Sequence, residues 1–195
     1  MRERIKEIIS SSIYVKELIY NDPKLISTIE SSTYEIIDCF NADCKVLLCG
    51  NGGSAADAQH IAAELSGRFY FDRDPLFAEA LHVNTSYVTA VANDYGYDEI
   101  YARLVKAMGK GGDILIGFST SGNSENILRA FKIAQEKNMT TILFSGESGG
   151  KIKTYSDHVI NVPSTDTPRI QESHIMIGHI MCELIEDKIF KNEKK

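Results

Sequence analysis

The sequence lacks the features of a membrane protein or a nucleic-acid-binding protein. No apolar run approaches the roughly 18–20 residues that a membrane span requires. The 21 lysines and arginines are scattered along the chain and outnumbered by 27 acidic residues, so the formal net charge is −6. Because no segment gathers basic residues, a broad electrostatic surface for nucleic acid is not expected. The sequence predicts neither a nucleic-acid partner nor a membrane partner.

The sequence predicts no secretory leader, and cysteine is scarce. The segment Met1–Tyr20 alternates charged residues with Ile5, Ile8 and Ile9, which is an amphipathic helical pattern without the apolar centre of a signal peptide. Four cysteines occur, with no C-x-x-C spacing: Cys39, Cys44, Cys49 and Cys182. We therefore expect a cytoplasmic protein whose cysteines are reduced and buried.

The composition that remains is that of an ordinary globular protein, with 43% hydrophobic and 25% charged residues. A chain of 195 residues is long enough for one domain and short for two, since domains usually have ~100–200 residues. We predict a single domain over residues 1–195, in which residues 1–40 form a helical extension and residues 41–195 form an α/β sandwich.

Apolar runs that alternate with helical patterns predict the fold class. From Arg2 to Phe40 the pattern is helical, with a break near Pro23, because proline disfavours helix in the residue before it. The predicted strands are Lys45–Cys49, Ala78–Val83, Asp113–Phe118, Thr140–Phe144 and Val159–Val162. The predicted helices beside them are Ser54–Leu65, Ser86–Ala92, Asp98–Met108, Ser124–Lys137 and Arg169–Phe190. Apolar strands separated by helices indicate a three-layer α/β/α sandwich around a five-stranded parallel sheet.

In such sheets ligands bind beyond the carboxyl ends of the strands, and the loop after the first predicted strand, Cys49–Ala55, is rich in glycine. Glycines let backbone N–H groups approach a ligand closely, and the N-terminus of the following helix favours an anion. Gly50, Gly52 and Ala55 also satisfy the G-x-G-x-x-A dinucleotide pattern. We disfavour a dinucleotide because the second strand ends at Val83–Asn84 with no acidic residue to hold a ribose.

The loop after the third predicted strand, Ser119–Ser124, carries four hydroxyl groups within six residues. It also contains one glycine and leads into a helix. Hydroxyl and backbone N–H donors at a helix N-terminus can bind a phosphate without lysine or arginine. Ordinary turn and N-cap chemistry favours the same residue types, so the spacing alone leaves both interpretations open.

The helix after the glycine-rich loop carries His60 and Glu64, four residues apart and therefore on one face about 6 Å apart along the axis. This spacing can offer a nitrogen and an oxygen to one metal ion, or place a base next to an acid. A surface i,i+4 pair is the simpler alternative. The helix is otherwise small and apolar, which favours a buried or functional face over a solvated one.

The last predicted helix carries Gln171, Glu172, His174 and His179. His179 lies in an apolar stretch, so a core histidine is an alternative to a ligand. Gln171 and His179 are eight residues apart, some 12 Å along a straight helix, and one metal cannot easily collect both. This distance motivates the hypothesis that two subunits complete the site at a symmetric interface. Two further histidines, His82 and His158, fall on strand-like segments and are interpreted as structural.

Together these segments resemble the phosphoheptose isomerases of the sugar isomerase (SIS) domain family over nearly the whole chain. The segments that carry the resemblance are Cys49–Ser54, His60–Phe69, Ala92–Asp94, Ser119–Ser124 and Arg169–Glu172, followed by His179. The resemblance implies the flavodoxin-like SIS fold. It also implies an aldose–ketose isomerase that converts sedoheptulose 7-phosphate to D-glycero-D-manno-heptose 7-phosphate through an enediol, in heptose biosynthesis for lipopolysaccharide or capsule. Pro168 departs from the pattern, since some relatives have an acidic residue there.

The resemblance also implies roles for individual residues. Glu64 is the candidate base, and His179 is the candidate acid and base. The implied ligands of one zinc ion per subunit are His60, Glu64, Gln171 and His179. The implied substrate contacts are Asn51, Gly52, Gly53, Ser54, Glu64, Arg68, Asn93, Asp94, Ser119, Thr120, Ser121, Ser124 and Gln171. The family forms homotetramers with active sites between subunits, which agrees with the two-subunit hypothesis.

Two other functions occur among similar proteins. Non-enzymatic members of the family bind the bacterial replication initiator, but they typically lack the acid and the histidine that match Glu64 and His179. A phosphosugar-sensing module would normally be attached to a DNA-binding domain, and residues 1–40 show no helix-turn-helix signature. The sequence therefore favours the enzyme.

Overall fold

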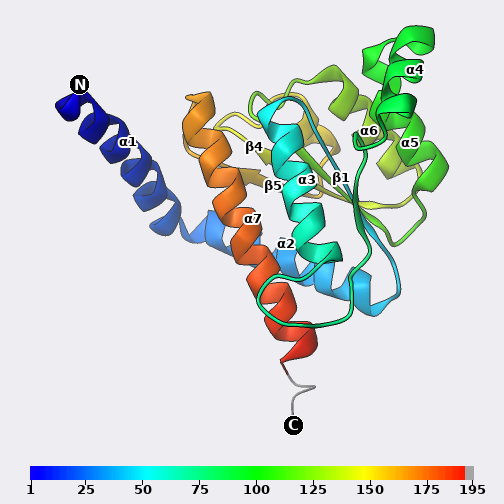
Figure 1. The fold of residues 1–195 in the computed structure, drawn as a ribbon, viewed down its shortest axis with the longest axis horizontal. Coiled ribbons are helices and arrows are strands. Elements are labelled where there is room, and N and C mark those ends of the chain that lie inside the picture. Colours follow the sequence, from blue (N-terminus) through cyan, green and yellow to red (C-terminus); the bar gives the residue numbers. More distant parts are fainter. Residues whose placement is uncertain (192–195) are drawn as a thin grey trace.

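The computed structural model describes residues 1–191 and has one parallel sheet among them (Figure 1). The strands are β1 (Val46–Gly50), β2 (Ala78–Ala80), β3 (Ile114–Ser119), β4 (Thr140–Ser145) and β5 (His158–Asn161). Every neighbouring pair is parallel, and the order is β2-β1-β3-β4-β5. This is the flavodoxin-like order of a doubly wound sheet. Residues 192–195 of the predicted domain lie outside the described residues.

Helices precede the sheet and alternate with its strands. They are α1 (Arg2–Tyr20), α2 (Pro23–Asn41), α3 (Gly53–Ser66), α4 (Thr85–Tyr95), α5 (Ile100–Met108), α6 (Glu125–Glu136) and α7 (Thr167–Phe190). Short 3-10 turns cover Tyr97–Glu99 and Ile152–Tyr155. The break between α1 and α2 falls where Pro23 predicts it, because Pro23 opens α2 and the Asp22 side chain caps it by accepting from two backbone N–H groups.

Helices cover both faces of the sheet, which confirms the three-layer sandwich. Side chains of each strand alternate between two cores. Val46 and Leu48 of β1 pack in the core that α2, α3 and α7 cover. Leu47 and Cys49 of the same strand pack in the core that α4, α5 and α6 cover. All four cysteines are free, and Cys44 alone among them is not buried.

The prediction for the second strand was too long. β2 is an edge strand that pairs only with β1, over Val46↔Ala78 to Leu48↔Ala80. The chain then turns at Leu81 and His82 towards α4, so His82 lies in a turn and not on a strand. The apolar pattern continues through this turn because Leu81 is buried in the core. A period-2 pattern cannot separate such a buried turn from a strand.

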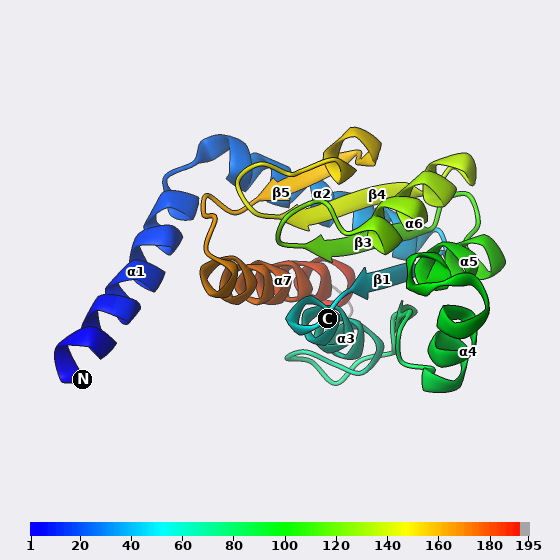
Figure 2. The ribbon, with the colours of Figure 1, turned by 90° about the horizontal axis from the view of Figure 1, so that it is seen from above.

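Helix α1 projects from the sandwich (Figure 2). Val15 and Ile19 near its end join the core, whereas Ile9 and Ile13 remain 53% and 51% exposed. Within the described residues, no helix is both long enough and apolar enough to cross a membrane.

Candidate active site

The two loops singled out from the sequence meet where β1 and β3 lie side by side. Gly50 is paired with Phe118, so the glycine loop (residues 50–54) and the serine loop (residues 119–124) leave neighbouring strands at the same edge of the sheet. The chain runs from β1 to β2 on one side and from β3 to β4 on the other. This is therefore the point at which the strand order reverses, where ligands bind in open α/β sheets. Gly52 has φ 57°, a left-handed conformation that suits glycine.

The glycine loop is joined to α6 by a pair of side-chain amides. Asn51 Nδ2 donates to Asn126 Oδ1 at 2.9 Å, and Asn126 Nδ2 donates to Asn51 Oδ1 at 2.9 Å. The hydroxyl of Tyr97 donates to the same Asn51 Oδ1 at 3.2 Å. Neither Asn126 nor Tyr97 was predicted as a site residue. No sequence motif marks either residue, and only the tertiary structure brings them to Asn51.

The serine loop forms one wall of a polar pocket of about 400 Å³. Thr120 and Ser121 line this pocket, and Ser119 Oγ lies 3.0 Å from Ser124 Oγ at the start of α6. The other lining residues are Asn123, Glu147, Ser148, Ser164, Thr165, Thr167 and Ile170. No lysine or arginine is among these described lining residues, so hydroxyl groups, backbone N–H groups and the helix N-terminus are the donors available to an anion.

His60 and Glu64 of α3 meet His179 of α7 at one point. Nε2 of His60 lies 3.0 Å from Oε1 of Glu64 and 3.2 Å from Nε2 of His179. The ligand atoms of all three residues lie within 4.8 Å of one another. The ring of Phe69 packs beside His179, with ring centroids 5.7 Å apart. His60 and Glu64 form an i,i+4 pair on a half-exposed face. The core-histidine alternative does not describe His179, because its partly exposed ring meets this pair.

The three converging residues fit a divalent metal ion. Tetrahedral zinc with bonds of ~2.0–2.1 Å places adjacent ligand atoms about 3.3 Å apart, and two histidines with a glutamate form a known catalytic zinc set. Two of the three separations, 3.0 and 3.2 Å, are close to that value, and the third is within 4.8 Å. The cluster can therefore hold a metal ion and leave a position open for a water molecule or a substrate oxygen.

Gln171, the fourth predicted ligand, lies against the glycine loop. Its side-chain amide is 2.7–2.8 Å from the place that a Cβ on Gly53 would occupy, so a larger residue there would displace the Gln171 amide. Gly53 precedes His60 by seven residues, about 10 Å along α3. The structure thus brings three of the four predicted ligands together within one chain, with Gln171 nearer the start of α3.

A carboxylate beside His60 was missed from the sequence. Asp57 lies on α3 one turn before His60, and its Oδ2 atom is buried with no hydrogen-bond partner among the described residues. Burial raises the pKa of Asp57 to about 6, against the opposing charge of His60. The sequence carried only a weak signal here, because an acidic residue in an alanine-rich helix is usually solvated.

The remaining predicted substrate contacts lie in the first turn of α3, beyond the far end of α3 and near the end of α4. Ser54 is buried in the first turn of α3, and Arg68 is exposed beyond the end of that helix. Asn93 and Asp94 are exposed near the end of α4, where Asn93 Nδ2 donates to Asp94 Oδ1 at 2.9 Å.

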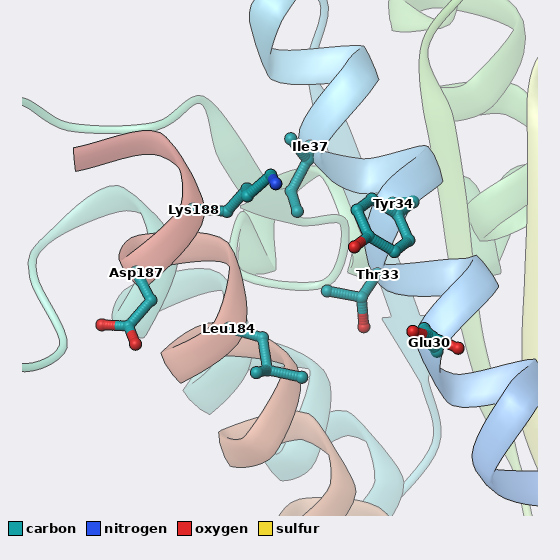
Figure 3. A pocket seen from close by; sticks show the side chains of 7 residues that line it. All are labelled: Glu30, Thr33, Tyr34, Ile37, Leu184, Asp187 and Lys188. Carbon is teal, nitrogen blue, oxygen red and sulfur yellow. The ribbon is translucent and has the colours of Figure 1, made fainter. Parts of the chain in front are cut away.

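A second hollow of about 260 Å³ lies between α2 and α7 (Figure 3). It is lined by Glu30, Thr33, Tyr34, Ile37, Leu184, Asp187 and Lys188. None of these residues belongs to the converging His60, Glu64 and His179 or to either loop. We therefore place the candidate site at the loops and the α3–α7 cluster.

Comparisons with known proteins identify the family of the chain. The family model described as SIS domain matches residues 15–146. Phosphoheptose isomerase from Clostridium acetobutylicum is 54% identical, over 97% of this chain and 97% of its own. That from Aneurinibacillus thermoaerophilus is 50% identical, over 99% and 98%.

A solved structure gives the same result for the fold. Phosphoheptose isomerase from Neisseria gonorrhoeae superposes with a TM-score of 0.89 at 42% identity and covers 95% of this chain and 98% of its own. The fold and the family model define an SIS-domain protein. The chain belongs to the phosphoheptose isomerases, and it is an enzyme of the isomerase class.

Proposed function

We propose that this enzyme converts sedoheptulose 7-phosphate to D-glycero-D-manno-heptose 7-phosphate by aldose–ketose isomerisation. The observation that carries the proposal is the convergence of Glu64 with His60 and His179 within 4.8 Å. The identity of over 50% with phosphoheptose isomerases supports the substrate class. Initiator-binding relatives typically lack the acid and the histidine that match Glu64 and His179.

The serine loop binds the phosphate group of the substrate. Ser119, Thr120, Ser121 and Ser124 offer hydroxyl and backbone donors beside the polar pocket. The N-terminus of α6 adds a positive partial charge, which favours a dianionic phosphate. The sugar then extends towards the glycine loop, Asn93, Asp94 and Gln171. Phosphate contacts of this kind hold the substrate equally in its ground state and transition state, so they contribute to binding more than to the chemical step.

Glu64 is the base that moves the proton between C1 and C2. In the open-chain ketose it takes a proton from C1, the C1–C2 double bond forms, and the carbonyl oxygen on C2 accepts a proton to give the enediol. Return of the proton to C2, with loss of the proton from the C1 hydroxyl, gives the aldose. His179 transfers the protons at the oxygens and assists opening of the cyclic sugar.

The candidate metal ion is zinc, one per subunit, held by His60, Glu64, His179 and Gln171. When bound, it supplies Lewis-acid polarisation of a carbonyl. A carboxylate that is bound to a metal is a poorer base, so Glu64 serves either as base or as ligand at any one moment. His60 contacts both other members of the cluster, and it fixes their relative positions through Nε2.

The active assembly that we propose is a homotetramer with sites completed between subunits. Two surfaces that are exposed to solvent in the single chain support this assembly. The outer half of α1 exposes Ile5, Ile9 and Ile13, which a second subunit can cover. The His60 side chain is 48% exposed at the candidate site, so a neighbouring subunit can close the site against water.

In the cell, the proposed location is the cytoplasm and the proposed product is a precursor of heptose in lipopolysaccharide or capsule. A phosphorylated ketose with seven carbons must come from a sugar-phosphate transfer reaction. The aldose 7-phosphate that forms keeps its phosphate and has a free C1. It is therefore ready for a reaction that activates C1.

The test is isomerisation of sedoheptulose 7-phosphate in heavy water, followed at C1 and C2 by NMR. We expect the aldose to appear with deuterium incorporated, and we expect Glu64→Gln to abolish both changes. Glu136→Gln, which removes an exposed carboxylate at the far end of α6, is the matched control and should behave as wild type. Absence of exchange, with thermal stabilisation by the sugar phosphate, would support a non-enzymatic binding or sensing function instead.

A further inference from the structure

The side-chain amide of Asn51 makes hydrogen bonds with all but one of its donor and acceptor positions. A side-chain amide has two N–H donors and one oxygen with two lone pairs. The oxygen of Asn51 accepts from Asn126 Nδ2 at 2.9 Å and from the Tyr97 hydroxyl at 3.2 Å. One of its N–H groups donates to Asn126 Oδ1 at 2.9 Å. Among the described residues, the second N–H group has no partner.

A backbone donor fixes which way both amides face. The N–H of Ile127 donates to Asn126 Oδ1 at 3.0 Å. Because a backbone N–H can only donate, this bond identifies the oxygen of Asn126. The reciprocal pair then places the nitrogen of Asn51 opposite that oxygen. Asn126 is 2% exposed, so water does not compete for these bonds.

Tyr97 reaches Asn51 from a different part of the fold. It begins the 3-10 turn after α4, where Gly96 with φ 93° redirects the chain. The side chain is exposed, yet its hydroxyl takes the second lone pair of Asn51. The amide of Asn51 is therefore held from α6 on one side and from the α4 end on the other, at the edge of the sheet where the strand order reverses.

We propose that Asn126 and Tyr97 are positioning residues that fix Asn51, so that its one free N–H donates to a hydroxyl or carbonyl oxygen of the sugar phosphate. This inference rests on the proposed function, since it assigns the sugar contact of the same site. A donor that is already oriented needs no reorganisation when the substrate oxygen gains charge. Asn126 and Tyr97 act only through Asn51, and this restriction makes the proposal testable.

The test is a double-mutant cycle. Asn126→Ala and Tyr97→Phe are each made in the wild-type background and in the Asn51→Ala background. We measure kcat/KM for sedoheptulose 7-phosphate, and the affinity for inorganic phosphate by calorimetry. In the wild-type background we expect Asn126→Ala to lower kcat/KM about tenfold and Tyr97→Phe about threefold. In the Asn51→Ala background we expect each change to have an effect below about twofold, and phosphate affinity should stay constant throughout.

The matched control is Thr141→Val, which removes a buried hydroxyl bonded to Asp157 at the opposite end of the sheet. It should leave kcat/KM within about twofold of wild type. The proposal is overturned if Asn126→Ala or Tyr97→Phe retains wild-type kcat/KM, or if either lowers kcat/KM by the same factor without Asn51. If the wild-type protein turns over no sugar phosphate, this result contradicts the proposed function but not the inference about Asn51. The cycle is then run on the affinity for sedoheptulose 7-phosphate, where the same pattern of effects decides the inference.

Discussion

Arg73 and Glu186 form an ion pair in which both side chains are 2% exposed, with Arg73 Nε 2.8 Å from Glu186 Oε1. The carboxylate also accepts from the backbone N–H groups of residues 69–71 at 2.6–3.0 Å. The guanidinium donates to the carbonyl oxygens of Glu64 and Leu65 near the end of α3. The pair thus fastens the loop after α3 to α7, and α3 and α7 are the two helices that carry the candidate metal ligands.

Removing one partner of this pair should destabilise the fold strongly. Arg73→Ala leaves the Glu186 carboxylate buried without its cation, and we expect a loss of about 3–5 kcal/mol in the free energy of unfolding. Urea denaturation measures this loss. The control is Arg4→Ala, which breaks an exposed pair with Glu7 and should leave the midpoint unchanged. Equal midpoints for the two variants would contradict a structural role for the buried pair.

The sheet could be predicted from the sequence because its determinants are local. The strands are short apolar runs, Pro23 separates the first helices, and Pro168 lies in the first turn of α7. Each of these signals is contained within a few residues. The second strand was predicted too long because Leu81 continues the apolar pattern into a buried turn. Only the ladder shows that β2 ends at Ala80.

The candidate site was predictable in part. His60 and Glu64 share a helical face, so their proximity follows from spacing. Asn126 is 75 residues from Asn51 and has no local pattern that marks it. The same is true of Arg73 and Glu186, which are 113 residues apart. Such pairs arise from the order of the strands and the packing of helices, which a single sequence does not contain.

The converging histidines should control metal binding. His60→Ala and His179→Ala each remove one of the four proposed ligands, so we expect each purified variant to carry less than about a tenth of the wild-type zinc. Atomic emission spectroscopy measures the content, and competition with a chromophoric chelator measures the affinity. His158→Ala changes a partly buried histidine near Ser31 and should retain wild-type zinc. Retention of wild-type affinity in both site variants would exclude this cluster as the metal site.

The serine loop and the α3–α7 cluster should separate binding from chemistry. Ser121→Ala removes a hydroxyl from the polar pocket, and we expect KM to rise more than kcat falls because phosphate contacts act uniformly. Glu64→Gln should abolish turnover while inorganic phosphate still binds. Steady-state kinetics and calorimetry provide the two readouts, with Ser27→Ala on the exposed face of α2 as the control. Equal loss of phosphate affinity in Ser121→Ala and Glu64→Gln would contradict this division.

His174 should make the protein less stable in mild acid. It is fully buried, its Nε2–H donates to the carbonyl oxygen of Ser145 at 3.2 Å, and burial lowers its pKa to about 4. In the unfolded chain a histidine has a pKa of about 6.5. Between those values the unfolded chain binds a proton that the folded protein does not, so the free energy of unfolding falls as the pH falls, by at most ~1.4 kcal/mol per pH unit.

The measurement must separate His174 from Asp57, whose pKa is raised to about 6 and whose effect on stability has the opposite sign. The contribution of His174 is therefore taken as the difference between wild type and His174→Gln, a variant that keeps an N–H donor. Urea denaturation of metal-free protein at pH 7.5 and pH 5 should show a smaller pH effect in His174→Gln and an unchanged effect in His158→Gln. Parallel pH profiles for all three proteins would mean that His174 becomes protonated in the folded state.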